Sequence, residues 1–162
     1  MNYHNITKCD MKNGSGLRVV LWVAGCEHMC KHCQNPQTWN HDSGILFDQQ
    51  ALDVLCQELN KDYHKGLTLS GGDPLSIKNR EFIANLLGYI KTLYPDKDVW
   101  CYTGYTWDEI KDLKCMEYID VLVDGKYIEE MSNPSPKWCG SNNQRVIDVK
   151  KSLNLDKIVL YT

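Results

Sequence analysis

The chain has 162 residues, which is enough for one domain but short of the roughly 250 residues of a complete eight-unit β/α barrel. Its 18 Lys and Arg residues are outnumbered by 21 Asp and Glu, and the net charge of -3 argues against a protein that binds nucleic acid through its phosphates. We therefore expect a single domain over residues 1–162, in which any barrel is partial, and no nucleic acid as partner.

Strand and helix patterns alternate along the first hundred residues. Arg18–Ala24 is an almost continuous run of β-branched and aromatic residues, which predicts a strand covered on both faces. Apolar residues recur at helical spacing over Asp48–Asn60 and over Glu81–Tyr94, where Pro95 stops the second helix. A short apolar run at Leu67–Leu69 predicts a strand between the two helices.

The alternation continues in the second half of the chain. One helix is expected to begin in a capping box formed by Thr106 and Glu109 and to run to about Lys114. The segment Ser132–Asn143 is rich in Pro, Ser and Asn and predicts a loop, which would serve as a lid or a contact surface. Further strand patterns lie at Asp98–Tyr102, Tyr118–Val123, Arg145–Val149 and Ile158–Tyr161.

Strands that alternate with helices predict an α/β fold with a mostly parallel sheet, here as a partial β/α barrel. Right-handed crossovers place the strand-to-helix loops on one rim, and α/β proteins bind ligands at the carboxyl ends of their strands. Four motifs fall in such loops and are expected to converge on one site: the cysteine-containing run 26–33, Gly71–Asp73, Thr103–Gly104 and Asp124–Lys126.

Three cysteines, Cys26, Cys30 and Cys33, follow the first predicted strand with the spacing C-x3-C-x2-C. This spacing is too compact for a useful loop-closing disulfide and indicates a shared metal centre. A 4Fe-4S cluster needs four ligands, so a set of three leaves one iron open to a small molecule. Two alternatives remain, a zinc site completed by His28 or His32 and three ordinary buried thiols.

The cysteine spacing resembles the signature of the radical S-adenosylmethionine enzymes, and it implies one 4Fe-4S cluster per chain together with S-adenosylmethionine. In that family an aromatic residue just before the third cysteine lies beside the adenine, and His32 occupies this position. The resemblance therefore implies that His32, Cys33 and Gln34 contact the cofactor. Imidazole in place of Tyr, Phe or Trp is a departure from the family pattern.

Gly71, Gly72 and Asp73 resemble the Gly-Gly-Glu motif of the same enzymes. Two glycines allow the backbone to approach a ligand closely enough for a carbonyl to accept from its ammonium group, and Asp73 would add a charge-assisted contact. An ordinary tight turn is the alternative. The dipeptide Asp124-Gly125 is likewise compatible with a hairpin turn as well as with a cofactor loop.

Five further segments resemble one branch of this superfamily, the activating proteins of anaerobic ribonucleoside-triphosphate reductases, which generate glycyl radicals. The branch uses a lysine at a strand end, which implies that Lys126 binds the methionine carboxylate. The five segments are Gly14–Arg18, Asn35–Trp39, Tyr102–Trp107, Val123–Lys126 and Gly140–Arg145.

The resemblance implies a mechanism that needs no catalytic acid or base from the chain. The reduced cluster would split S-adenosylmethionine into methionine and a 5'-deoxyadenosyl radical, which would take hydrogen from a glycine of the reductase large subunit. An external one-electron donor such as flavodoxin is implied, and an incomplete barrel wall would leave room for the protein substrate. The alternatives are an activase of pyruvate formate-lyase or of another glycyl-radical enzyme, a radical enzyme for a small molecule, and a zinc-dependent binding module.

The remaining sequence features concern the cellular compartment. The first ten residues contain no apolar export segment, and the longest apolar run, Val19–Ala24, falls far short of the roughly 18 residues of a membrane span. We therefore expect a cytoplasmic protein without a membrane partner, whose cysteines are reduced. Five scattered cysteines are expected to serve packing: Cys9, Cys56, Cys101, Cys115 and Cys139.

Overall fold

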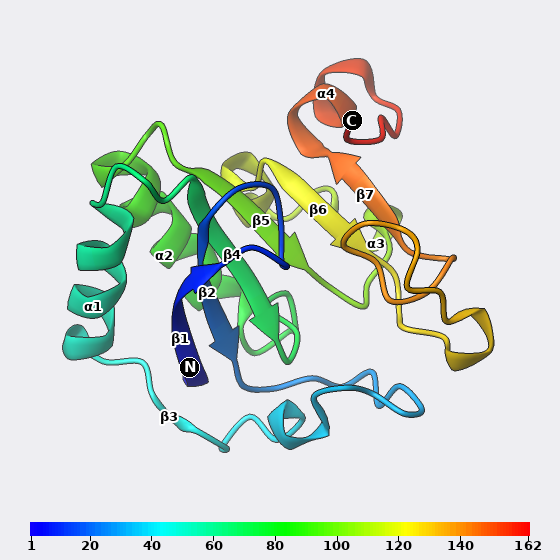
Figure 1. Cartoon of the computed structure of the whole chain (residues 1–162), viewed down its shortest axis with the longest axis horizontal. Coiled ribbons are helices and arrows are strands. Elements are labelled where there is room, and N and C mark those ends of the chain that lie inside the picture. Colours follow the sequence, from blue (N-terminus) through cyan, green and yellow to red (C-terminus); the bar gives the residue numbers. More distant parts are fainter.

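Seven strands form one mixed sheet in the order β3-β1-β2-β4-β5-β6-β7 in the computed structural model, which describes residues 1–162. Its centre is parallel and consists of β2 (Arg18–Val23), β4 (Gly66–Gly71), β5 (Asp98–Tyr102) and β6 (Val121–Asp124). Antiparallel strands flank this centre, namely β1 (Asn2–Asp10) and β3 (Ile45–Leu46) at one edge and β7 (Arg145–Asp148) at the other. The expected α/β fold is confirmed, with a parallel sheet only at its centre (Figure 1).

Two helices, α1 (Gln49–Leu59) and α2 (Arg80–Leu93), cover one face of the sheet (Figure 1). Their apolar residues share one core with the strand side chains that point to that face, such as Leu21, Leu69 and Cys101. Two shorter helices follow, α3 (Trp107–Ile110) and α4 (Val149–Leu155). Three 3-10 turns complete the set: η1 (Pro36–Thr38), η2 (Lys114–Tyr118) and η3 (Glu129–Met131).

Most predicted elements occur within a residue or two of their expected positions. Helix α1 begins after Asp48, whose carboxylate accepts a hydrogen bond from the amide of Ala51 at 2.9 Å. The capping box of Thr106 and Glu109 is present at the start of α3. That helix ends at Ile110 rather than Lys114, because the chain turns into η2, which also delays the predicted fourth strand from Tyr118 to Val121.

At the chain ends one prediction was wrong and two elements were not predicted. The strand expected over Ile158–Tyr161 is a single isolated bridge, between Leu160 and Ile147. Strand β1 was not predicted, because its mostly polar residues show no alternation of the kind that a half-buried strand has. Helix α4, with seven residues, is too short to carry a clear helical period.

Loops rather than helices cover the second face of the sheet. The Arg18 side chain lies on this face, fully buried, and donates from Nε to Oγ1 of Thr68 at 2.8 Å. Its guanidinium also pairs with Asp98 at 2.5 Å and lies 5.4 Å from the ring centroid of Trp100. A further bond from Nη1 to the carbonyl of Ser15, at 3.0 Å, ties the loop before β2 to the sheet.

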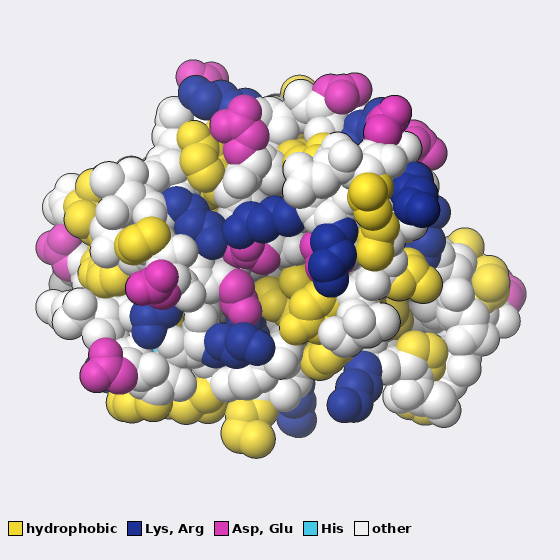
Figure 2. All heavy atoms as spheres, turned by 90° about the horizontal axis from the view of Figure 1, so that it is seen from above, with side chains coloured by type: hydrophobic (Ala, Val, Ile, Leu, Met, Phe, Trp, Pro, Cys, Tyr) yellow, Lys and Arg dark blue, Asp and Glu magenta, His cyan; other side chains and the backbone are white.

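The end of the molecule at which the parallel strands begin carries charges of both signs. Figure 2 shows this end, with Lys and Arg side chains interspersed with Asp and Glu. Such mixing gives this face no broad basic surface. None of the helices combines the length and the apolar character that crossing a bilayer demands.

Replacement of Arg18 by Leu should destabilise the fold by about 3 kcal/mol, because it leaves buried partners without their donor. Urea unfolding under anaerobic conditions, followed by circular dichroism, measures the change. Lys111→Met is the control, since Lys111 makes only an exposed pair with Asp108 at 4.0 Å, and its effect should stay below about 0.5 kcal/mol. Equal effects of the two substitutions would contradict the role given to Arg18.

Candidate metal centre

A cavity of about 860 Å³ lies at the carboxyl ends of the parallel strands. In Figure 1 the arrowheads of β2 and β4 point to the same edge of the sheet, along which the segment after β2 runs. All four predicted motifs contribute to the cavity wall, so the expected convergence is confirmed. The wall residues from these motifs include Cys26, Cys30, Cys33, Gly71, Gly72, Asp73, Thr103, Gly104 and Gly125.

The three cysteines that the loop after β2 contributes to this wall, Cys26, Cys30 and Cys33, are free, half-buried thiols. Burial raises the pKa of Cys26 to about 11, although the backbone N–H of His28 acts in the opposite direction. Burial also raises the pKa of Cys30, against the backbone N–H of Tyr127. Cys33 Sγ accepts from the amide of Asn35 at 3.3 Å. Three thiols, each with a nearby amide donor, fit an iron-sulfur cluster, whose binding releases the thiol protons.

The arrangement of side chains does not support the zinc alternative. No three His, Cys, Asp or Glu side chains converge on a point that would hold a single ion. Each of the two candidate histidines contacts a carboxylate through one ring nitrogen, Asp73 at 2.6 Å for Nε2 of His28 and Glu129 for Nδ1 of His32. Thiolates of a 4Fe-4S cluster bind different irons and need not meet at one point.

The double glycine brings two loops into close backbone contact. The amide of Gly72 donates to the carbonyl of Val23 at 2.8 Å, and the amide of Asp73 donates to that of Gly25 at 2.7 Å. A Cβ atom on Gly72 would lie 2.5 Å from the carbonyl oxygen of Gly25, which is closer than real contacts allow. The absence of a side chain at Gly72 therefore lets the cysteine loop begin against the end of β4.

The carboxylate of Asp73 faces the protein, although the residue borders the cavity. Its Oδ1 accepts from the amide of Leu75 at 2.8 Å and its Oδ2 from the amide of Gly104 at 2.9 Å. The hydroxyl of Thr103 at 2.9 Å and Nε2 of His28 at 2.6 Å complete the set. Four donors occupy the roughly four lone-pair positions of a carboxylate, which leaves none for a ligand ammonium.

The other predicted contact residues are divided between the cavity wall and its surroundings. Gln34 borders the cavity with Cys33, whereas His32 and Lys126 are exposed and lie outside the wall. The imidazole of His32 is paired with Glu129, as noted above. Lys126 is near enough to Cys30 for its positive charge to oppose the rise in the pKa of that thiol that burial causes.

The dipeptide Asp124-Gly125 is not a hairpin turn, because residues 125–144 separate β6 from its antiparallel neighbour β7. The buried carboxylate of Asp124 accepts from the amide of Trp107 at 2.8 Å and from Nε of Arg145 at 3.0 Å. Asp124 thus joins three elements of the fold, while Gly125 borders the cavity.

The loop predicted over Ser132–Asn143 closes one side of the cavity, with Ser132–Gly140 in the wall. Its Cys139 borders the cavity and also packs against the core cluster around Trp100, in agreement with the expected packing role. This loop is held by Trp138, whose ring lies edge-on to Trp100 at 4.8 Å. Of the other scattered cysteines, Cys101 and Cys115 are buried in the core and Cys56 packs against it, as expected, whereas Cys9 is exposed, so the packing role predicted for Cys9 was wrong.

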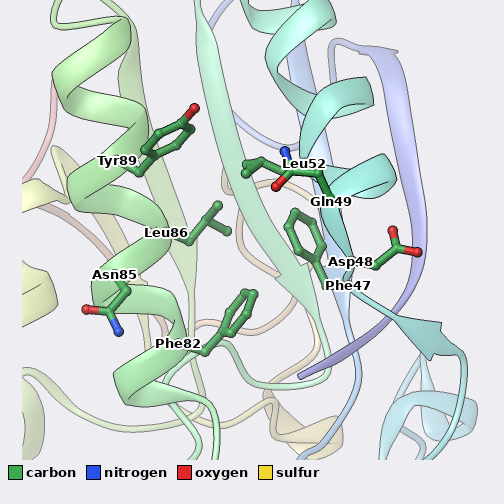
Figure 3. Close-up of a pocket in the computed structure, with 8 residues that line it drawn as sticks. All are labelled: Phe47, Asp48, Gln49, Leu52, Phe82, Asn85, Leu86 and Tyr89. Carbon is green, nitrogen blue, oxygen red and sulfur yellow. The ribbon is translucent and has the colours of Figure 1, made fainter.

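A second pocket, of about 380 Å³, lies between α1 and α2 (Figure 3). Its walls are mainly apolar and include Phe47, Leu52, Phe82 and Leu86. The carboxylate that borders it belongs to Asp48, which already caps α1. This pocket holds none of the chemical groups expected of a metal centre.

Three half-buried thiols at the carboxyl edge of an α/β sheet define an iron-sulfur protein, and residues 12–147 match the 4Fe-4S single cluster domain. The chain is 49% identical over 147 residues to the anaerobic ribonucleoside-triphosphate reductase-activating protein of Enterobacteria phage T4, covering 90% of this chain and 93% of the phage protein. The protein of the same name from Vibrio cholerae is 44% identical over 148 residues, covering 89% and 96% of the two chains. That from Escherichia coli K12 is 41% identical over 150 residues, covering 90% and 97%.

This chain belongs to the family of anaerobic ribonucleoside-triphosphate reductase-activating proteins. The family suggested by the cysteine spacing and the five further segments is therefore confirmed.

Substitution of Gly72 by Ala should displace the cysteine loop, because the added methyl group meets the backbone of Gly25 at 2.5 Å. We expect a substantial loss of iron and sulfide per chain after anaerobic reconstitution. Gly88→Ala, in α2, is the control, because its Cβ would have its nearest neighbour at 3.4 Å and should leave iron content unchanged. Full iron content in the Gly72 variant would refute the close approach.

Proposed function

We propose that this chain activates an anaerobic ribonucleoside-triphosphate reductase by reductive cleavage of S-adenosylmethionine and formation of a glycyl radical on the reductase. The observation that carries the proposal is the cavity at the carboxyl edge of the sheet, in whose wall the cysteine loop places three free thiols and no fourth. The remaining free thiol of the wall, Cys139, comes from the separate loop Ser132–Gly140. Membership of the activating-protein family supplies the class of partner.

Cys26, Cys30 and Cys33 would hold three irons of a 4Fe-4S cluster and leave the fourth for the amino and carboxylate groups of S-adenosylmethionine. Such a cluster, once reduced, would supply the one electron for reductive cleavage of S-adenosylmethionine, which yields methionine and, after a hydrogen atom is taken from the target glycine, 5'-deoxyadenosine and a glycyl radical. The chain itself orients the cofactor and target and limits access of water. No acid or base is required from its side chains.

The cofactor contacts are proposed for the residues that border the cavity. The backbone of Gly71 and Gly72 and the side chain of Gln34 lie in its wall and are accessible to a ligand there. Lys126 is exposed next to Gly125, from where its flexible ammonium can reach toward a carboxylate. For His32 to contact the adenine, its imidazole has to exchange Glu129 for the ligand.

The architecture is compatible with a single radical S-adenosylmethionine domain over residues 1–162, built as a partial β/α barrel. Four parallel strands support this view, as does the position of the cavity at their carboxyl ends. The protein substrate would approach on the side bounded by the loop Ser132–Gly140. A small one-electron donor of the flavodoxin type would reduce the cluster.

Replacement of Cys30 by Ala should abolish both cluster retention and cleavage of S-adenosylmethionine, because one iron loses its thiolate. The assay measures iron, acid-labile sulfide and 5'-deoxyadenosine after reduction with dithionite. Cys56→Ala is the control, since this half-buried thiol lies on α1 away from the cavity wall, and it should retain full cleavage. Turnover by the Cys30 variant at the wild-type rate would remove the cluster assignment.

Binding of the reductase should slow amide hydrogen exchange in the two loops of the cavity border that contain Gly72 and Trp138. The physical reason is that a glycine-bearing segment has to enter the cavity and cover these amides. The comparison is exchange with and without the reductase, measured anaerobically with the cofactor present. Amides of the carboxyl-terminal half of α2 serve as an internal reference, because that half lies away from the cavity. Unchanged exchange at the cavity border would count against this docking site.

A further inference from the structure

The cysteine loop is joined to three other segments by three carboxylate–imidazole pairs. Glu27 pairs with His41 at 2.9 Å, His28 with Asp73 at 2.6 Å, and His32 with Glu129. The three pairs differ in how far their side chains are buried. The side chains of His28 and Asp73 are 7% and 1% exposed, against 19% and 45% for His41 and Glu27 and 67% and 32% for His32 and Glu129.

The buried pair connects the cysteine loop to two further strand-end loops. Asp73 follows β4, and its carboxylate also accepts from Thr103 and Gly104, which follow β5. All of these partners are donors, so Nε2 of His28 must carry a hydrogen to approach the same carboxylate at 2.6 Å. This requirement fixes the orientation of the imidazole ring.

Neighbouring groups also confine the imidazole sterically. A Cβ atom on Gly104 would lie 2.4 Å from Cδ2 of His28, so the ring occupies the space that a side chain at Gly104 would need. Its other neighbour is the ring of Tyr105, edge-on with centroids 4.5 Å apart. The guanidinium of Arg80 in turn lies 4.9 Å from the centroid of Tyr105. The ring is held by shape as well as by its hydrogen bond.

His28 lies midway between two of the cluster ligands, Cys26 and Cys30. Fixing its side chain therefore fixes the backbone that carries both thiols. The backbone N–H of His28 also donates to the sulfur of Cys26. Amide donors to ligand sulfurs stabilise the reduced form of a cluster and so raise its reduction potential.

We propose that His28 and Asp73 are a positioning pair for the metal centre, in which the Asp73 carboxylate acts on the cluster through the imidazole and not on the ammonium group of S-adenosylmethionine. The inference rests on the proposed function, since it presumes a cluster on the three cysteines. It differs from the contact expected of Asp73 by resemblance, because the carboxylate has no acceptor position free.

The test uses full-length protein with its reconstituted cluster and no S-adenosylmethionine. We compare His28→Ala, His28→Gln, Asp73→Asn and the His28→Ala/Asp73→Asn double variant. The readouts are the electron paramagnetic resonance spectrum of the reduced cluster, its midpoint potential, and the rate of iron loss to a chelator.

The Ala and Asn variants should show an altered spectrum, a more negative potential and iron loss faster by roughly 10-fold or more, as found when groups behind a metal ligand are removed. The double variant should resemble either single variant, because both break one interaction. His28→Gln should restore the wild-type values in large part, since its amide can donate to Asp73. If His28→Gln does not restore the wild-type values, the proposal is overturned. This comparison with the wild type remains valid even if His28→Ala does not fold.

The matched control is Glu27→Ala, which removes the more exposed partner of the Glu27–His41 pair on the same loop, keeps His41 in place, and should leave all three readouts unchanged. An equal effect in this control would show general loosening of the loop and overturn the proposal. It would also be overturned if the cofactor-free clusters of the Asp73→Asn and His28→Ala variants match the wild type while only the affinity for S-adenosylmethionine falls. Wild-type protein that assembles no cluster would instead refute the proposed function.

Discussion

The rest of the structure depends on the placement of one loop that has neither helix nor strand to hold it. The cysteine loop is fixed at its start by main-chain bonds, from Gly25 to Thr38 at 2.6 Å and from Cys26 to Trp39 at 3.0 Å. Its middle is fixed by the buried contact of His28 with Asp73. A cluster tolerates little error in the positions of its thiolates, so the surrounding loops have to provide the rigidity that secondary structure usually supplies.

The sheet provides that rigidity through its parallel centre. Parallel strands end at the same edge of the sheet, so the loops that follow β2, β4 and β5 lie next to one another there. Helices α1 and α2 bury one face, while the other is closed by loops anchored through Arg18 and Trp100. Because loops and not helices cover the second face, this face has room for a cavity, whereas a covering helix would fill the same space.

The sequence predicted those parts of the molecule that follow from local pattern. The strand Asp98–Tyr102 was predicted with its observed limits, and α1 within one residue, because apolar period and capping residues act over a few neighbours. The common location of the four motifs followed from the handedness of βαβ units. Strand β1 lacked such a pattern, since its register is set by pairing with β2 rather than by its own side chains.

The candidate site was predictable in its residues but not in their contacts. Cysteine spacing identifies ligands, yet no local rule relates His28 to Asp73, which lie 45 positions apart. The same limit applies to His32, whose pairing with Glu129 spans 97 positions. Long-range partners depend on how the loops pack, and a motif taken alone does not reveal whether its carboxylate is already occupied.

The packing of Trp138 against Trp100 and Tyr161 gives the protein an optical property of its own. Trp138 belongs to the cavity loop, whereas Trp100 is wholly enclosed in the sheet. Indole emission moves to longer wavelength as the ring enters water, so displacement of this segment alters the intrinsic fluorescence. Arrival of a protein substrate can therefore be followed in real time without attaching a dye.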